Sequence, residues 1–196
     1  MRKWLKPKQN EAEYARLAAE LAELLQLEAQ GYLQVYFGDE SGFCLDPCVP
    51  YGWQARGHYT GVLAQKSGRR NVFGLLSRTN QFEGYETFGT MNAQLLVACL
   101  DDFATKITQK TVVVLDNAPF HRAALLQDKL AEWQEKDLYI WFLPAYSPHL
   151  NLIETLWRKI KYEWLKPHHF ANWQCFNEAL DEIFAEIGAK YTIQFT

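Results

Sequence analysis

Three acidic residues in this sequence have the type and spacing that could support chemistry. Asp39 comes near the predicted end of an apolar strand in "VYFGDESGF", and Asp116 follows directly on the apolar run "TVVVL". Glu154 falls in the first turn of a helix predicted from "NLIETLWRKIK". If the two strands are parallel neighbours, their ends meet at one edge of a sheet, where open α/β sheets place their sites. A helix that begins there could direct Glu154 to the same point.

Such a cluster predicts a metal site. Three carboxylates without basic partners repel one another, so they can be ionised together only around a cation. An all-oxygen ligand set favours Mg²⁺ or Mn²⁺ over zinc. Two such ions, roughly 3.5–4 Å apart, are the usual device for phosphodiester chemistry, one activating the attacking oxygen and the other stabilising the leaving oxygen. We therefore predict that Asp39, Asp116 and Glu154 hold two divalent ions.

Each acid also has an ordinary structural explanation. Asp39 could be a turn residue and Asp116 could cap a helix. Glu154 lies three residues after Asn151, so these two could form a capping box. Each explanation suffices for one residue alone, whereas the order of two strand-end aspartates and a first-turn glutamate favours the metal site.

The helix that carries Glu154 has a polar stripe beside its apolar face. Glu154, Arg158 and Lys161 fall at positions i, i+4 and i+7, so an acid is followed by two bases on one side. One interpretation is a solvated face with an ion pair between Glu154 and Arg158. The other is that Arg158 and Lys161 hold DNA phosphates while Glu154 holds metal.

The remaining pattern describes an α/β sheet of mixed direction. Three strands precede a helix and are expected to form an antiparallel meander, the first ending near Asp39. Two continuous apolar runs, "TVVVLD" and "DLYIWFLP", are typical of strands buried on both faces. Helices are predicted over 10–29, 91–107, 120–135, 151–165 and 173–187, the meander strands within 32–43, 69–79 and 82–90, and a turn with a short strand over 50–60.

Composition limits the class of protein. The 196 residues are 48% hydrophobic, which suits one domain of ordinary size, and the net charge of −3 argues against holding nucleic acid by bulk charge. No stretch approaches 18 apolar residues, so no membrane span is expected. Four cysteines and the lack of a basic and apolar leader predict a reducing cytoplasm, for a DNA-acting protein in association with the nucleoid.

Four stretches together resemble a known family. "DESGF", "GW…ARG", "LDNAPFH" and "LPAYSPHLNLIETLW" are similar to the DDE transposases of bacterial insertion sequences related to the mariner superfamily, over about residues 32–188. The resemblance implies an RNase H-like fold, a mixed five-stranded sheet flanked by helices, over residues 31–196 after a connector helix in 1–30. It also implies Mg²⁺- or Mn²⁺-dependent cut-and-paste DNA transposition by Asp39, Asp116 and Glu154, with water and then a 3′-hydroxyl as nucleophiles.

Two features depart from that family's pattern. Leu152 replaces the usual proline before the third acid, and proline is favoured there only for its preset φ. Residues 1–30 are too short for the helix-turn-helix modules that read transposon ends. We therefore expect a separate or fused helix-turn-helix portion to act with this chain. The expected partners are transposon-end and target DNA and further copies of the chain in a synaptic complex.

The resemblance suggests further DNA contacts more loosely. Asn117, next to Asp116, could orient that acid or a phosphate, and His121 could approach a phosphate or water. Arg56 is a possible DNA contact after the first strand. Two alternatives to an active transposase remain open at this point: a non-catalytic regulatory or assembly fragment of a split transposase, and an RNase H-like nuclease acting on other nucleic acid.

Overall fold

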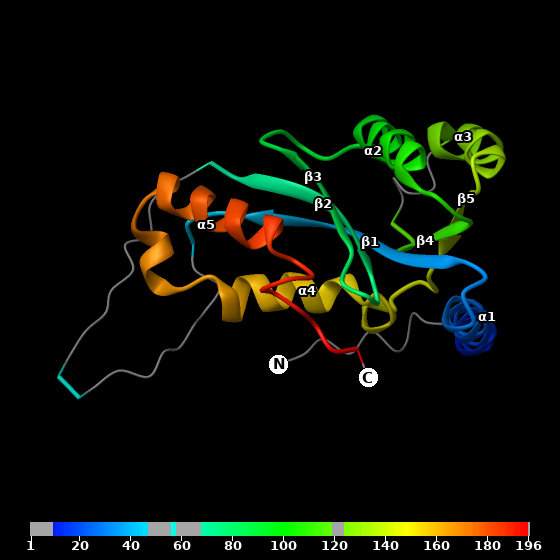
Figure 1. Cartoon of the computed structure of the whole chain (residues 1–196), viewed down its shortest axis with the longest axis horizontal. Coiled ribbons are helices and arrows are strands. Elements are labelled where there is room, and N and C mark those ends of the chain that lie inside the picture. Colours follow the sequence, from blue (N-terminus) through cyan, green and yellow to red (C-terminus); the bar gives the residue numbers. More distant parts are fainter. Residues whose placement is uncertain (1–9, 47–55, 58–67, 119–123, 196) are drawn as a thin grey trace.

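The computed structural model describes residues 10–46, 56–57, 68–118 and 124–195. In these residues a mixed sheet has the strand order β3-β2-β1-β4-β5, with helices on both faces (Figure 1). The strands are β1 (Gln34–Phe43), β2 (Arg70–Ser77), β3 (Phe82–Thr87), β4 (Thr111–Leu115) and β5 (Leu138–Phe142). The helices are α1 (Glu11–Ala29), α2 (Ala93–Lys106), α3 (Ala124–Glu135), α4 (Ile153–Lys159) and α5 (Trp173–Ala185).

The strand directions agree with the predicted meander and parallel pair. Strands β1, β2 and β3 pair antiparallel, whereas β4 pairs parallel with both β1 and β5. All five residues of β4 are buried because the strand lies inside the sheet and is covered on both faces. The prediction for "TVVVL" is therefore confirmed, and the fold is a mixed five-stranded α/β sheet.

Two strand predictions were wrong in detail. Strand β1 does not end near Asp39 but continues to Phe43, because its second half is held by the antiparallel ladder to β2 after β4 has stopped. Strand β5 is not buried on both faces: only Leu138 is fully buried, since β5 forms an edge of the sheet. An apolar run predicts a strand well but does not reveal that the strand has one neighbour.

The two faces of the sheet carry separate cores. On one face α2 and α3 lie together, with Leu96, Leu100 and Trp133 buried against β1 and β4. On the other face α4 and α5 bury Leu156 and Leu180. Figure 1 shows α2 and α3 above the sheet and α4 below it. The acids of interest face the second core.

The region predicted as one helix over 151–165 holds an α-helical and a π-helical segment, with a 3₁₀ turn ahead of them. A 3₁₀ turn at Pro148–Leu150 leads into α4, and a π-helical segment, Ile160–Trp164, follows. Glu154 does lie in the first turn of α4. The short strand predicted within 50–60 lies, apart from 56–57, outside the described residues. Within the described ranges, no helix is both long and apolar enough to cross a bilayer.

Candidate active site

The sheet brings the two aspartates together. The last parallel pair between β1 and β4 is Gly38 with Leu115, so Asp39 and Asp116 each come one residue further along. Side chains alternate along a strand. Phe37 and Val114, two residues before each acid, both belong to the core under α4, and both acids therefore face the α4 side.

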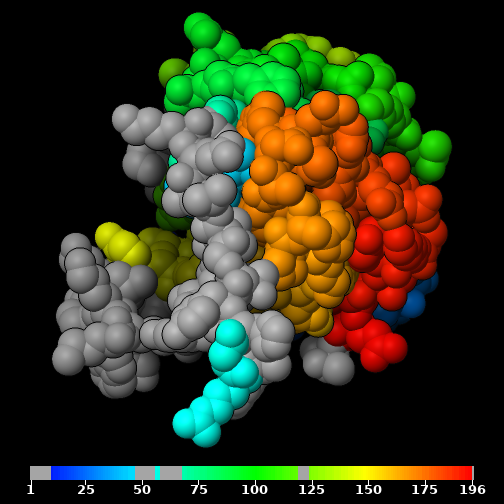
Figure 2. Space-filling model, turned by 90° about the vertical axis from the view of Figure 1, so that its left-hand side faces the viewer, coloured from blue at the N-terminus to red at the C-terminus, as the bar shows by residue number. Residues whose placement is uncertain are grey.

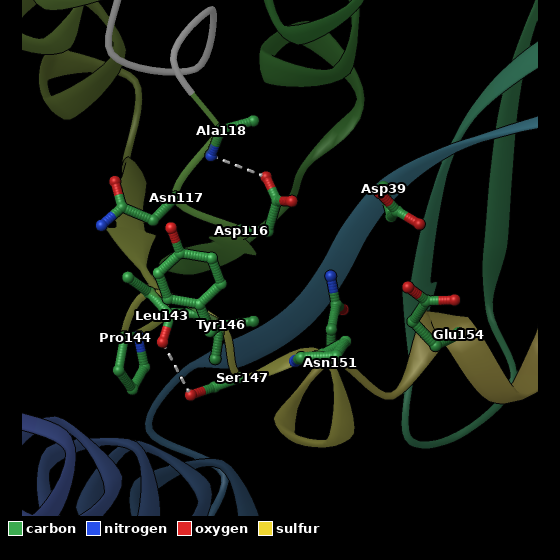
Figure 3. Close-up of a pocket in the computed structure, with 12 residues that line it drawn as sticks. Asp39, Asp116, Asn117, Ala118, Leu143, Pro144, Tyr146, Ser147, Asn151 and Glu154 are labelled. Carbon is green, nitrogen blue, oxygen red and sulfur yellow. Dashed lines mark hydrogen bonds between the residues drawn. The ribbon is translucent and has the colours of Figure 1, made fainter. Parts of the chain in front are cut away.

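Helix α4 supplies the third acid at the same place. Ile153 and Trp157 are buried and anchor the start of the helix against the sheet, while Glu154 is exposed between them. Asp39, Asp116 and Glu154 together line one cavity of about 480 Å³. Figure 3 shows Asp39 and Glu154 on one side of this cavity and Asp116 between them and the Asn117–Ala118 segment.

Asp39 is the most perturbed of the three. Burial raises its pKa from 3.8 to about 8, and the nearby Glu154, Glu40 and Asp116 carboxylates add to the rise. Its Oδ2 accepts a hydrogen bond from the Trp157 indole at 3.2 Å, which fixes the carboxyl group against α4. Asp39 lies inside β1 and is therefore not a turn residue. Its raised pKa favours the protonated carboxyl group when no cation is bound.

Glu154 and Asp116 are less constrained. Partial burial raises the pKa of Glu154, Lys161 opposes that rise and Asp116 adds to it. The Asp116 Oδ1 accepts a hydrogen bond from the Ala118 backbone N–H at 3.1 Å. Asp116 therefore also organises the turn after β4, a structural role that is compatible with a place in the site.

Asn151 is a site residue that the sequence assigned to another role. Its Nδ2 donates to the Gly38 carbonyl at 3.0 Å, so it ties the chain before α4 to the residue before Asp39. The capping box with Glu154, which was the alternative to the metal site, does not form, because Leu152 is the N-cap of α4 and makes no side-chain cap. The Asn151 Oδ1 is buried and finds no hydrogen-bond partner within the described part of the chain. Its sequence signals were its place ahead of an apolar helix and its position in the stretch that resembles the transposase family.

The residues present fit a divalent cation in chemistry. The donors are oxygens only, neighbouring carboxylates help to raise the pKa of Asp39 and of Glu154, and an unpaired amide oxygen stands among them. No three Asp, Glu, His or Cys side chains of the described residues are already gathered around one point. The three carboxylates line the wall of the cavity. To bind one ion together, their side chains would have to rotate toward one another.

Three of the predicted DNA contacts line the cavity or the groove beside it. Asn117 lines the cavity beside Asp116. Arg158 and Lys161 line an adjoining groove of about 860 Å³, which shares Asn151 and Glu154 with the cavity.

The ion pair that the structure shows on this helical stretch joins Lys159 to Glu163. Among the described residues Glu154 has no such pair with Arg158, so that part of the solvated-face interpretation is wrong.

Two predicted contacts remain, and the structure describes only Arg56. Arg56 lies on an exposed turn, 56–57, which projects from the body of the molecule (cyan in Figure 2) and does not line the cavity. His121 lies outside the described residues.

The region that contains the three acids is similar to known proteins. Residues 34–176 match the family model described as DDE superfamily endonuclease. No curated protein matches the chain. The catalytic domain of Mos1 mariner transposase is similar in fold, with a TM-score of 0.58 at 17% identity, over 94% of this chain and 85% of that one.

Two Mos1 complexes are similar to the same degree. The paired-end complex with the left transposon end has a TM-score of 0.58 at 18% identity and covers 99% of this chain. The pre-cleavage transpososome has a TM-score of 0.58 at 18% identity and covers 96% of it. This chain spans 60% of the length of the chains in both complexes. At these identities the likeness establishes the fold, which is the RNase H-like one.

Proposed function

Because this chain belongs to the DDE superfamily of endonucleases, we propose that it is the catalytic part of a DNA transposase of a bacterial insertion sequence related to mariner. It would cut and rejoin phosphodiester bonds by cut-and-paste transposition. One observation carries the proposal: Asp39, Asp116 and Glu154 come from β1, the end of β4 and α4, lie within the matched region and line one cavity.

The proposed ligands of Mg²⁺ or Mn²⁺ are these three carboxylates, and we propose two ions. Mos1 paired-end complexes with Mg and with Mn are among the similar structures. When bound, the ions would supply the positive charge that activates the attacking oxygen and stabilises the leaving one. The mutual repulsion of the carboxylates supports this assignment, because a cation relieves it.

The chain's own residues prepare the site. Asp39 has to give up its proton before it can bind a cation. The Trp157 indole donates a hydrogen bond to its carboxylate and holds that group beside α4. Asn151 holds the start of α4 against β1, so Glu154 stays near Asp39. The hydrogen bond from the Ala118 N–H restricts the carboxylate of Asp116.

DNA would approach along the groove beside α4. Arg158 and Lys161 line it next to Glu154, which suits contacts to phosphates flanking the one that reacts. Asn117 could orient a phosphate inside the cavity itself. Arg56 and His121 are proposed as DNA contacts only from the resemblance.

The proposal extends to the organisation of the whole protein. We propose residues 1–30 as a connector and 31–196 as the catalytic domain. The partners would be transposon-end and target DNA, further copies of the chain in a synaptic complex and a helix-turn-helix portion, acting at the nucleoid. The complete set of acids favours catalysis over a purely regulatory fragment.

Nicking of supercoiled plasmid DNA tests the proposal. With Mg²⁺ or Mn²⁺ the wild-type protein should nick the plasmid, whereas Asp116→Ala and Glu154→Gln should not. Asp137→Asn is a matched control, because Asp137 is an exposed acid at a turn outside the cavity. Equal nicking by wild type and Asp116→Ala would remove the catalytic claim. Cleavage of an RNA–DNA hybrid but not of DNA would favour an RNase H-like nuclease instead.

A further inference from the structure

Tyr146 is an aromatic residue in the cavity for which the acids give no role. It lines the same cavity as Asp116 and Glu154, and 48% of it is exposed. Figure 3 shows its ring beside Asn117 and Pro144, on the side of the cavity away from Asp39 and Glu154. Among the described residues it makes no hydrogen bond through its hydroxyl and no contact with another aromatic ring.

The backbone at Tyr146 makes the residue type harder to explain by folding. Its φ is 59°, in the left-handed region that glycine and asparagine adopt with little cost and bulky residues avoid. The turn between β5 and α4 would therefore form more easily with either small residue. A half-exposed ring also contributes little to the core. Fold stability does not account for a tyrosine at this position.

The cavity has two chemically different halves. The acidic half is formed by Asp39, Asp116 and Glu154. The other half is neutral and largely apolar, and it is formed by Ala118, Leu143, Pro144, Ala145 and Tyr146. A nucleic-acid strand has the same division, since each charged phosphate lies next to a sugar and a flat base. The cavity volume of about 480 Å³ is within the usual range for a small ligand.

We propose that Tyr146 is a stacking platform for the nucleobase next to the scissile phosphate. This inference rests on the proposed function, because the acids define where that phosphate lies. An aromatic ring accepts any base, since every base has a π-face, so the contact positions the strand without reading its sequence. A base that stacks here has to leave its own duplex stack, so the strand end in the cavity is unpaired.

Fluorescence of 2-aminopurine tests the proposal without cleavage. The probe is a short DNA duplex with a frayed end that carries 2-aminopurine at its unpaired positions. Ca²⁺ is added as the only divalent ion, because it takes the same oxygen ligands. The full chain should quench the probe on binding. Tyr146→Phe should behave as wild type, and Tyr146→Leu should bind roughly 5- to 150-fold more weakly without quenching.

Two further variants separate stacking from folding. Tyr146→Asn suits the left-handed backbone, so it should unfold at the same temperature as wild type or higher and still lose quenching. Tyr32→Leu removes a tyrosine that is 69% exposed outside the cavity and should bind as wild type does. The inference is wrong if Tyr146→Leu and Tyr146→Asn quench like wild type, or if wild type itself does not quench. Plasmid nicking is measured separately. Quenching without nicking would therefore contradict the proposed nuclease activity but not the proposed stacking of a base on Tyr146.

Discussion

Asp39 and Asp116 directly follow Gly38 and Leu115, the last paired residues of the parallel strands β1 and β4. Beyond this pair β4 turns away at Asp116, whereas β1 continues and is held by β2 alone. The cavity lies where one strand stops and its neighbour goes on, with α4 across the opening. The site is thus a consequence of unequal strand length in an otherwise continuous sheet.

The first prediction concerns Asp39 in the absence of metal. Its raised pKa means that the folded protein binds more protons than the unfolded chain between 3.8 and about 8, so stability falls as pH rises through that interval. Asp39→Asn removes this effect. In EDTA its melting temperature should exceed that of wild type by a margin that widens up to about pH 8 and then levels. Thermal unfolding across this pH range measures the margin, with Asp137→Asn as the control. A margin that is constant or shrinks with pH would show that Asp39 is not destabilised by its surroundings.

The second prediction concerns Asn151. Asn151→Ala removes a buried hydrogen bond to the Gly38 carbonyl. The free energy of unfolding should fall by about 1–3 kcal/mol. Nicking should also slow, because the start of α4 is no longer fixed beside Asp39. Urea unfolding and single-turnover nicking are the measurements, and the idea fails if both are unchanged.

The third prediction concerns the glycine opposite Asp39. Gly74 pairs with Asp39 in the ladder between β1 and β2, and a Cβ there would lie 2.6 Å from Cη2 of Trp157. Gly74→Ala should therefore displace the indole that orients Asp39 and cost about 1–3 kcal/mol in unfolding free energy.

Gly89→Ala is the matched control for this change, because among the described residues its Cβ would meet only the Thr87 Oγ1 at 3.4 Å. Denaturant unfolding compares the two variants. Equal stability of both would mean that Trp157 can move aside freely and does not constrain Asp39.

The sequence singled out three acids that line one cavity in the structure, but it did not predict the elements around them. The continuous apolar run before Asp116 predicted a central strand correctly, because burial on both faces leaves a simple pattern. The continuation of β1 past Asp39 depends on its ladder with β2, which local sequence does not encode. Asn151 was considered only as a possible helix cap, because a polar residue before a helix usually has that role, and its partner Gly38 is distant in sequence. Tyr146 lies in the stretch that carries the family resemblance, but the sequence indicated no role of its own for it, since its backbone conformation appears only in the fold.

The fourth prediction tests the groove beside α4. If Arg158 and Lys161 each hold a phosphate, Arg158→Gln and Lys161→Gln should each weaken DNA binding regardless of sequence. Each should also lower the slope of log affinity against log salt by about 1. Fluorescence anisotropy over a salt series measures the slope. Lys136→Gln is the control, because Lys136 pairs with Glu132 on α3, away from the groove. Slopes equal to that of wild type would leave this face as a solvated surface.

The most direct test of the central claim is anomalous scattering from crystals of the full chain soaked in Mn²⁺. We expect a peak inside the cavity, within bonding distance of carboxylate oxygens of Asp39 and Asp116, with Glu154 turned toward it or toward a second peak. The same soak of Asp116→Ala crystals should lose that peak. An empty cavity in the wild-type soak, with manganese bound only elsewhere on the surface, would contradict the assignment of these three acids as a metal site.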